Sequence, residues 1–177
     1  MFKAALAVST GLALCSAVAS AQSPGLGKAI SEADIKAWDL DAAPSGKGLP
    51  PGSGTAAQGA KVYAEKCAAC HKPDLTGGGV PAAGALIGGA PLTNGMGTAQ
   101  TIANFYGYST TLFDYIRRSM PFQAPRTLTN DEVYALTAFL LSANKIIPDK
   151  QVMNAETLPR VKMPSAGIFI NRFPDRI

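Results

Sequence analysis

Histidine and cysteine are scarce in this 177-residue chain, which contains one histidine and three cysteines. A structural zinc site needs four such ligands. Once the N-terminal segment discussed below is set aside, only Cys67, Cys70 and His71 remain, so a zinc site lacks one ligand. For the same reason, one chain cannot supply two histidine ligands to a single iron.

The chain also lacks clusters of like charge. Its formal net charge is +4, but no run of Lys and Arg with interleaved aromatic residues occurs, so a nucleic-acid partner is not expected. A Gly-x-x-x-x-Gly-Lys-Ser/Thr motif is absent too, which argues against a phosphate-binding loop of that kind. The mild positive charge suggests at most an acidic docking partner.

The apolar segment at the N-terminus is too short to span a membrane as a mature helix. Residues 1–21 combine basic Lys3, an apolar stretch and the small residues Ala19-Ser20-Ala21. This pattern predicts a secretory signal peptide that is cleaved after Ala21. Cys15 follows Leu14, where a lipoprotein signal would have a small residue, so no membrane anchor is expected. We therefore predict a periplasmic protein.

The one histidine directly follows two of the cysteines. Cys67-Ala68-Ala69-Cys70-His71 is the pattern for covalent attachment of a c-type haem. Two cysteines three residues apart on a helical turn can each form a thioether with a haem vinyl group, and the next residue then binds the iron as an axial ligand. A thioredoxin-like dithiol would need a βαβ setting, and a plain disulfide would leave His71 unexplained. The sequence predicts one covalently attached haem c.

Helical periodicity occurs in three segments of the chain. Residues 56–70 present the haem motif at their end, with Ser53 or Thr55 as the N-cap. Residues 130–143 follow the capping box Thr129-Asn130-Asp131-Glu132. Residues 110–120 end at Pro121 and carry an apolar stripe that comprises Leu112, Phe113, Tyr115 and Ile116. These helices predict an all-α domain at 53–147.

A glycine-rich loop separates the helix expected at 56–70 from the one expected at 110–120. It runs from residue 72 to about 97, and we expect it to pack in order against the haem, since glycine lets a backbone approach a flat ring closely. The alternative is a linker without a fixed conformation. Pro81 or Pro91 could direct a carbonyl group at the free ring nitrogen of His71 and fix its tautomer. Pro81 is favoured because it is nearer the motif.

Two irregular arms, residues 22–52 and 148–177, flank this domain. They contain little periodicity apart from a short helical segment at 31–38, and we expect them to wrap a partner or to cover the core. Trp38 is the only tryptophan. It is expected to pin the N-terminal arm to the domain, with contact to a partner as the alternative.

Methionine is the expected second axial ligand, because the chain has no second histidine. Met120 is favoured, since Pro121 breaks the helix there and places the thioether on a rigid turn. The other methionines of the mature chain are alternatives that can equally fill gaps in the core: Met96, Met153 and Met163. With both axial positions occupied, we expect electron transfer and not catalysis at the iron.

Two arginines precede this methionine. We expect Arg117 or Arg118 to neutralise a haem propionate or to contact a partner, with Arg117 as the candidate for the propionate. Alternatively, both are solvated cations that the helix dipole stabilises.

From the haem motif to the last helix, the sequence resembles a class I cytochrome c, on the strength of Cys67-Ala68-Ala69-Cys70-His71 and Met120-Pro121. More narrowly, it resembles the cytochrome subunits of bacterial sulfite dehydrogenases and Sox sulfane dehydrogenases. The segments that carry this likeness are Trp38-Asp39-Leu40-Asp41 and residues 48–54, 110–122 and 158–164. The resemblance implies a class I cytochrome c-like fold with long irregular arms.

The same resemblance implies a molybdopterin-containing partner that oxidises a sulfur substrate and passes single electrons to this haem. The electrons would continue to a downstream cytochrome or oxidase of the respiratory chain. Some Sox cytochrome subunits carry a second haem motif, whereas this chain has one, which favours the sulfite dehydrogenase type. The alternative is a general soluble carrier between other dehydrogenases and a terminal oxidase.

Overall fold

The computed structural model describes residues 26–92 and 98–168. The expected signal peptide and Met96 lie outside the described residues. Along the chain the elements are α1 (Glu32–Trp38), β1 (Ser53–Gly54), α2 (Ala56–Lys66), α3 (Ala68–His71), α4 (Ile102–Phe105), α5 (Ser109–Ser119), α6 (Asn130–Ala143), β2 (Met153–Asn154), and the 3-10 turns η1 (Leu158–Arg160) and η2 (Ala166–Ile168). Within these ranges, no helix is both long and apolar enough to cross a membrane.

The helix starts follow from side-chain capping. Thr129 accepts a hydrogen bond from the backbone N–H of Glu132, whose carboxylate accepts one from Thr129 in return, so the predicted capping box of α6 is confirmed. Of the two candidates for the N-cap of α2, Thr55 has that position. The helix predicted over 56–70 is divided in two, because Cys67 leaves helical geometry with φ −125° and ψ −35°.

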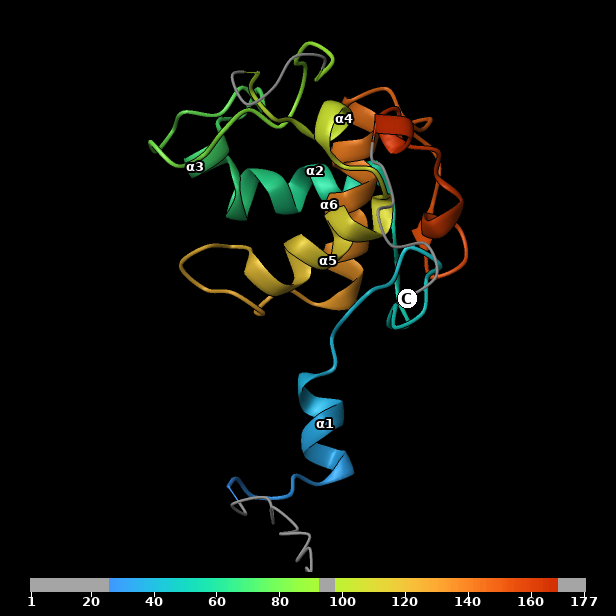
Figure 1. Cartoon of the computed structure of the whole chain (residues 1–177). Helices are drawn as coiled ribbons and strands as arrows, with labels where there is room; N and C mark the ends of the chain where they lie inside the picture. The colour runs from blue at the N-terminus through green and yellow to red at the C-terminus, as the bar shows by residue number, and fades with distance from the viewer. Residues whose placement is uncertain (1–25, 93–97, 169–177) are drawn as a thin grey trace, which may run out of the picture.

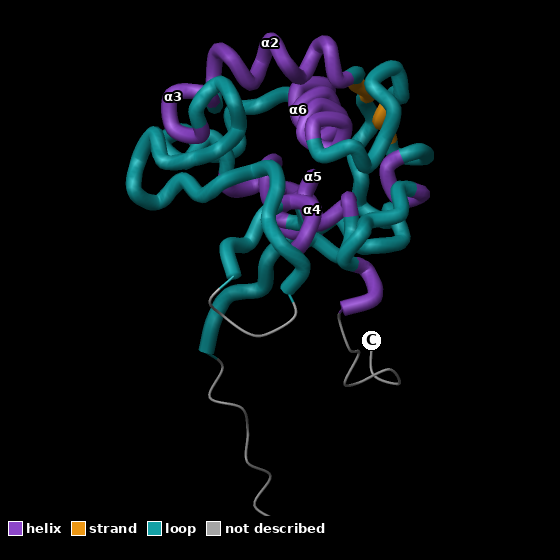
Figure 2. Tube along the Cα trace, turned by 90° about the horizontal axis from the view of Figure 1, so that it is seen from above, coloured by secondary structure: helices purple, strands orange, loops and turns teal. Residues whose placement is uncertain are grey.

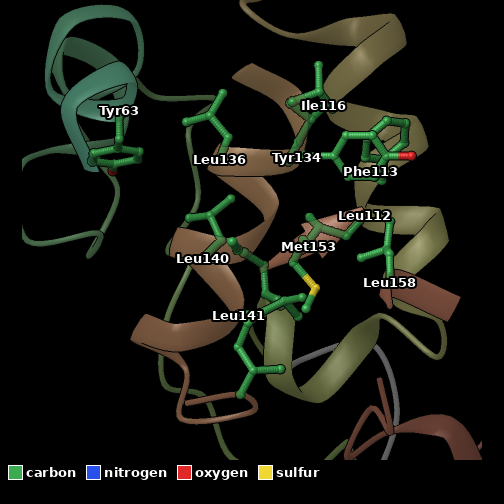
Figure 3. Close-up of a cluster of buried hydrophobic side chains, with 14 of the residues drawn as sticks. Tyr63, Leu112, Phe113, Ile116, Tyr134, Leu136, Leu140, Leu141, Met153 and Leu158 are labelled. Carbon is green, nitrogen blue, oxygen red and sulfur yellow. The ribbon is translucent and has the colours of Figure 1, made fainter. Parts of the chain in front are cut away.

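The core forms where α2 and α5 pack against α6 (Figure 1). A Cβ atom at Gly59 would lie 1.9 Å from the carbonyl oxygen of Ala135, so the close crossing of α2 and α6 depends on the absence of a side chain there. The ring centroids of Phe113 on α5 and Tyr134 on α6 lie 4.5 Å apart. Figure 3 shows these rings among the buried aliphatic side chains that hold the helices together.

The apolar face of α5 is narrower than the sequence suggested. Leu112, Phe113 and Ile116 are buried, but Tyr115 is 46% exposed. The sequence predicts Tyr115 within the stripe, but it lies beyond the edge of the stripe. Its position on the helix places it on a different side from the three buried residues.

The C-terminal arm is part of the core. Met153, Leu158 and Met163 are 0%, 0% and 5% exposed and belong to the same cluster as the residues of α5 and α6. β2 pairs antiparallel with β1, with Ser53 opposite Asn154. In Figure 1 this segment, coloured orange to red, runs along the side of the helices. Of the two roles expected for the arms, covering the core is the one observed here.

The N-terminal arm behaves differently. None of the residues of α1 is buried, and the helix stands away from the rest of the molecule (Figure 1). Trp38 is 79% exposed and touches the guanidinium of Arg126, which lies 5.7 Å from the ring centroid. Trp38 therefore contacts the domain through the Arg126 guanidinium, but its ring is not buried there. Further along the arm, residues 40–42 make polar contacts with α5.

Candidate haem site

The Cys-Ala-Ala-Cys-His motif forms a single tight turn at the end of α2. The backbone N–H groups of Cys70 and His71 both donate to the carbonyl oxygen of Cys67, at 3.1 and 3.0 Å. The two cysteines thus lie on one turn, three residues apart, as attachment to a single haem requires. Both are free thiols and half-buried, so no disulfide joins them.

The backbone after this turn folds back onto it. Gly77 and Gly79 donate to the carbonyl oxygens of His71 and Cys70, at 3.1 and 2.9 Å. A Cβ atom at Gly79 would lie 2.5 Å from the Cys70 oxygen, so a side chain there would displace the loop. The described part of the glycine-rich loop therefore folds back on the motif (Figure 2), and its packing against the haem stays a prediction.

Tyr63 fixes the other side of the motif. It projects from α2 in the core, and its hydroxyl donates to the carbonyl oxygen of Lys72 at 2.8 Å, directly after His71. Burial raises the pKa of Tyr63 to about 12, so the phenol stays protonated and able to donate. The position of His71 is thus set from α2 as well as from the loop.

The expected role of Pro81 needs correction. The carbonyl oxygen that lies within hydrogen-bonding distance of His71 Nδ1 is that of Gly84, at 3.4 Å. Pro81 is exposed within a turn that the bond from Ala83 N–H to the Val80 carbonyl closes. A proline at the second position of such a turn lies at its tip, and the chain comes back to the histidine three residues later.

Met120 differs from the other two described methionines. It is the C-cap residue of α5, in extended geometry with φ −117° and ψ 149°, and it is only half-buried at the edge of the core. Met153 and Met163 are enclosed in the core, where their thioethers fill space. This environment favours Met120 as the second ligand, which remains a prediction.

The surroundings of the motif fit a flat apolar group. Several apolar side chains of the described residues are left half-buried at the edge of the core, and they belong to α2, α3, the loop after α3, the connection from α5 to α6, and α6: Val62, Ala68, Leu86, Ile87, Met120, Leu128 and Phe139. In Figure 1, α3 with its loop and the connection from α5 to α6 extend to the same side of α6. Covering such surface with a macrocycle removes apolar area from water.

The environment of Cys67 keeps its thiol neutral. Burial raises the pKa of this thiol to about 11, so it is not the low-pKa thiolate of a redox-active dithiol. Across the described ranges, no group of three or more His, Cys, Asp or Glu side chains is arranged to hold a metal ion. The donor set therefore fits thioether attachment with one axial imidazole.

The two arginines are engaged with the N-terminal arm. Arg117 donates to the carbonyl oxygen of Leu40 at 3.2 Å. Arg118 forms ion pairs with Asp41, at 3.1 Å, and with Asp114 on its own helix. The contact observed for Arg117 is thus with the arm, and its role toward a haem propionate stays a prediction.

Comparison with known proteins defines the class. Residues 56–144 match the family model of cytochrome c, so the chain belongs to the cytochrome c family, in agreement with its helical fold and its haem-attachment turn. Members of this family carry covalently bound haem and transfer electrons. The expected class I cytochrome c fold is thereby confirmed.

A solved structure gives a narrower likeness. The chain is similar to a chain in the crystal structure of the sulfane dehydrogenase SoxCD from Paracoccus pantotrophus, with 37% sequence identity and a TM-score of 0.74. The similarity covers 87% of this chain and 75% of that chain, and it confirms the resemblance to a Sox cytochrome subunit. No curated protein sequence matches the chain significantly.

Proposed function

We propose that this chain is a periplasmic monohaem cytochrome c that accepts single electrons from a sulfite- or sulfane-oxidising molybdoenzyme and passes them to the respiratory chain. The observation that carries the proposal is the 37% identity to a chain of a sulfane dehydrogenase. It combines with a single haem-attachment motif whose thiols are free and whose backbone is held from two sides.

The residues of the motif have distinct roles in this proposal. Cys67 and Cys70 would hold the haem by thioethers, and His71 and Met120 would occupy its two axial positions. The haem supplies a centre that exchanges one electron at a time. The Gly84 carbonyl orients the His71 ring, and the hydroxyl of Tyr63 keeps the backbone after it in place. A thioether ligand favours Fe(II) and so raises the reduction potential.

The sulfur chemistry belongs to the partner. Both axial positions of the haem are assigned to side chains, so no position at the iron is left for substrate. The single motif favours a sulfite-oxidising partner, and the likeness to a sulfane dehydrogenase chain favours a sulfane-oxidising one. Both partners need the same one-electron acceptor, and an experiment separates them.

The test is stopped-flow mixing of the oxidised haem protein with each dehydrogenase and its substrate. We expect rapid haem reduction with one of the two enzymes and none when the sulfur substrate is omitted. Chemical reduction with ascorbate provides the control that the haem is competent. If neither enzyme reduces the haem while an unrelated dehydrogenase does, the chain is a general carrier and the proposal is wrong.

A further inference from the structure

The N-terminal arm carries apolar side chains that nothing in the described structure covers. Leu26, Ile30, Ile35 and Trp38 are 87%, 67%, 42% and 79% exposed. Ile35 and Trp38 are three residues apart on α1, so they share one face of that helix. Clusters of this kind on a protein surface mark sites of interaction with another molecule.

Helix α1 has stabilising side-chain caps of its own, although it stands away from the core. An isolated helix of seven residues is marginal in water, yet α1 has a complete capping box in which Ser31 and Asp34 satisfy each other's backbone N–H groups. Its first turn contains Glu32 and Asp34, whereas helices that lie on membranes are rich in basic residues on their polar face. A protein surface is therefore the better occupant for the face of Ile35 and Trp38.

The arm contacts the connection between α5 and α6, which follows Met120. Arg126 lies over the Trp38 ring at 5.7 Å and donates to the carbonyl oxygen of Ala37 at 3.4 Å. Phe122, two residues after Met120, is 83% exposed. A partner that covers α1 would thus also meet the connection that follows the expected axial ligand.

The two arms also differ in what they already cover. The C-terminal arm is used in the core of this chain, and α1 is not. The similarity to the sulfane dehydrogenase chain covers 87% of the sequence, well beyond the family match at 56–144, so it includes flanking segments that a cytochrome c domain does not require. This favours a dehydrogenase subunit over a second copy of the chain.

We infer that α1, with Ile35 and Trp38, and Phe122 on the connection that contacts α1 form an apolar docking surface for the catalytic subunit of the dehydrogenase. The inference rests on the proposed function and adds the site of contact. Because the anchoring residues are apolar, the complex should persist at high salt, where contacts between exposed charges are screened. Such an anchor makes the cytochrome a lasting subunit and not a diffusing carrier.

The experiment compares the holoprotein with the double variant Ile35→Ser/Trp38→Ser. The matched control is Val152→Ser, which changes a residue of similar exposure, 44%, on the other arm. Co-elution with the dehydrogenase at 0.5 M salt (about 4 Å screening length) and the enzyme concentration for half-maximal haem reduction are measured. We expect the double variant to lose co-elution and to need at least roughly tenfold more enzyme, while Val152→Ser matches the wild type.

The outcomes separate the two claims. Equal binding and equal reduction by wild type and double variant, with the wild type reduced rapidly, would overturn the docking surface and leave the proposed function intact. A wild type that neither dehydrogenase reduces would overturn the proposed function, and the occupant with it. Self-association of the wild type that the double variant abolishes would assign the surface to a second copy. An unchanged haem spectrum in each variant verifies that the fold is preserved.

Discussion

Met120 and Met163 occupy environments that place different demands on a thioether. Met120 is half-exposed at the end of α5, whereas Met163 is 5% exposed within the core. We expect Met120→Ala to remove the weak sulfur-to-iron charge-transfer band of the oxidised protein and to lower the reduction potential, because the soft ligand that favours Fe(II) is lost. Absorption spectra and a redox titration measure both effects.

The control for this prediction is Met163→Ala. It should keep the band and reduce the free energy of unfolding by about 2–5 kcal/mol, as truncation of a buried methionine does. A band that survives in Met120→Ala and disappears in Met163→Ala would reverse the two assignments.

Gly59 is the residue on which the crossing of α2 and α6 depends. Alanine is the better helix former by about 1 kcal/mol, but its Cβ atom would lie 1.9 Å from the Ala135 oxygen. Since that neighbour is backbone and cannot rotate away, we expect Gly59→Ala to destabilise the protein by roughly 1–3 kcal/mol. Urea denaturation measures the change. Gly167→Ala, with no atom within 4 Å of the added Cβ, is the control and should be neutral.

At the scale of single residues, the sequence identified the groups whose chemistry is local. Cys67, Cys70 and His71 lie within five consecutive residues of the sequence. The structure places them on one turn, as that spacing predicts. The partner of His71 Nδ1 was assigned to Pro81 and is Gly84. The path of a glycine-rich loop depends on its hydrogen bonds to the motif, which the order of residues does not reveal.

Among the helices, α6 has the most explicit start signal, and that start is sensitive to pH. Hydrogen bonding to Lys66 on α2, followed by the N–H of Thr129, lowers the pKa of Glu132. A carboxylate whose pKa is lower in the folded state stabilises the protein above its unfolded pKa and loses this effect as the pH falls through the folded pKa. The contribution of Glu132 should therefore be present at neutral pH and vanish in acid.

The variant Glu132→Gln tests this prediction. Glutamine can still complete the capping box, as Gln58 does at the start of α2, so only the charge is removed. We expect a loss of at most about 1 kcal/mol at pH 7, because both side chains are partly exposed, and a loss that shrinks as the pH falls into the acid range. In a double-mutant cycle with Lys66→Met, additive losses at pH 7 would disprove coupling between the two helices.

The elements differ in how well their local sequence predicts them. The predicted bounds of α6 are correct and those of α5 differ by one residue, because an apolar face repeated over three turns and a capping or breaking residue specify each of them. The four-residue α4 and the two-residue strands were not predicted. Elements this short carry no periodicity, and they form because distant segments pair with them or pack on them.

For the molecule as a whole, the C-terminal arm is a stabilising part of the core. A chain that ends at Lys150 loses Met153, Leu158 and Met163. Burying one such side chain contributes about 1.5–3 kcal/mol, so the loss is comparable with the roughly 5–15 kcal/mol that stabilises a typical domain. We expect this truncation to abolish cooperative thermal unfolding, as followed by circular dichroism.

A chain that ends at Ile168 keeps all three side chains and should unfold like the full chain. If the chain that ends at Lys150 also retained a cooperative transition at the original temperature, the arm would contribute nothing to the core. That result would contradict the burial described for it.

The pairing of β1 with β2 also has a consequence in time. Ser53 meets Asn154 across the ladder, so this pairing closes a loop of about a hundred residues. Pairings of such long range form late in folding, because the entropy of closing the loop has to be overcome before the contacts are gained. Until the ladder closes, Cys67 and Cys70 are more accessible than in the folded domain, where both are half-buried. Late closure thus favours attachment of the haem before the fold is complete.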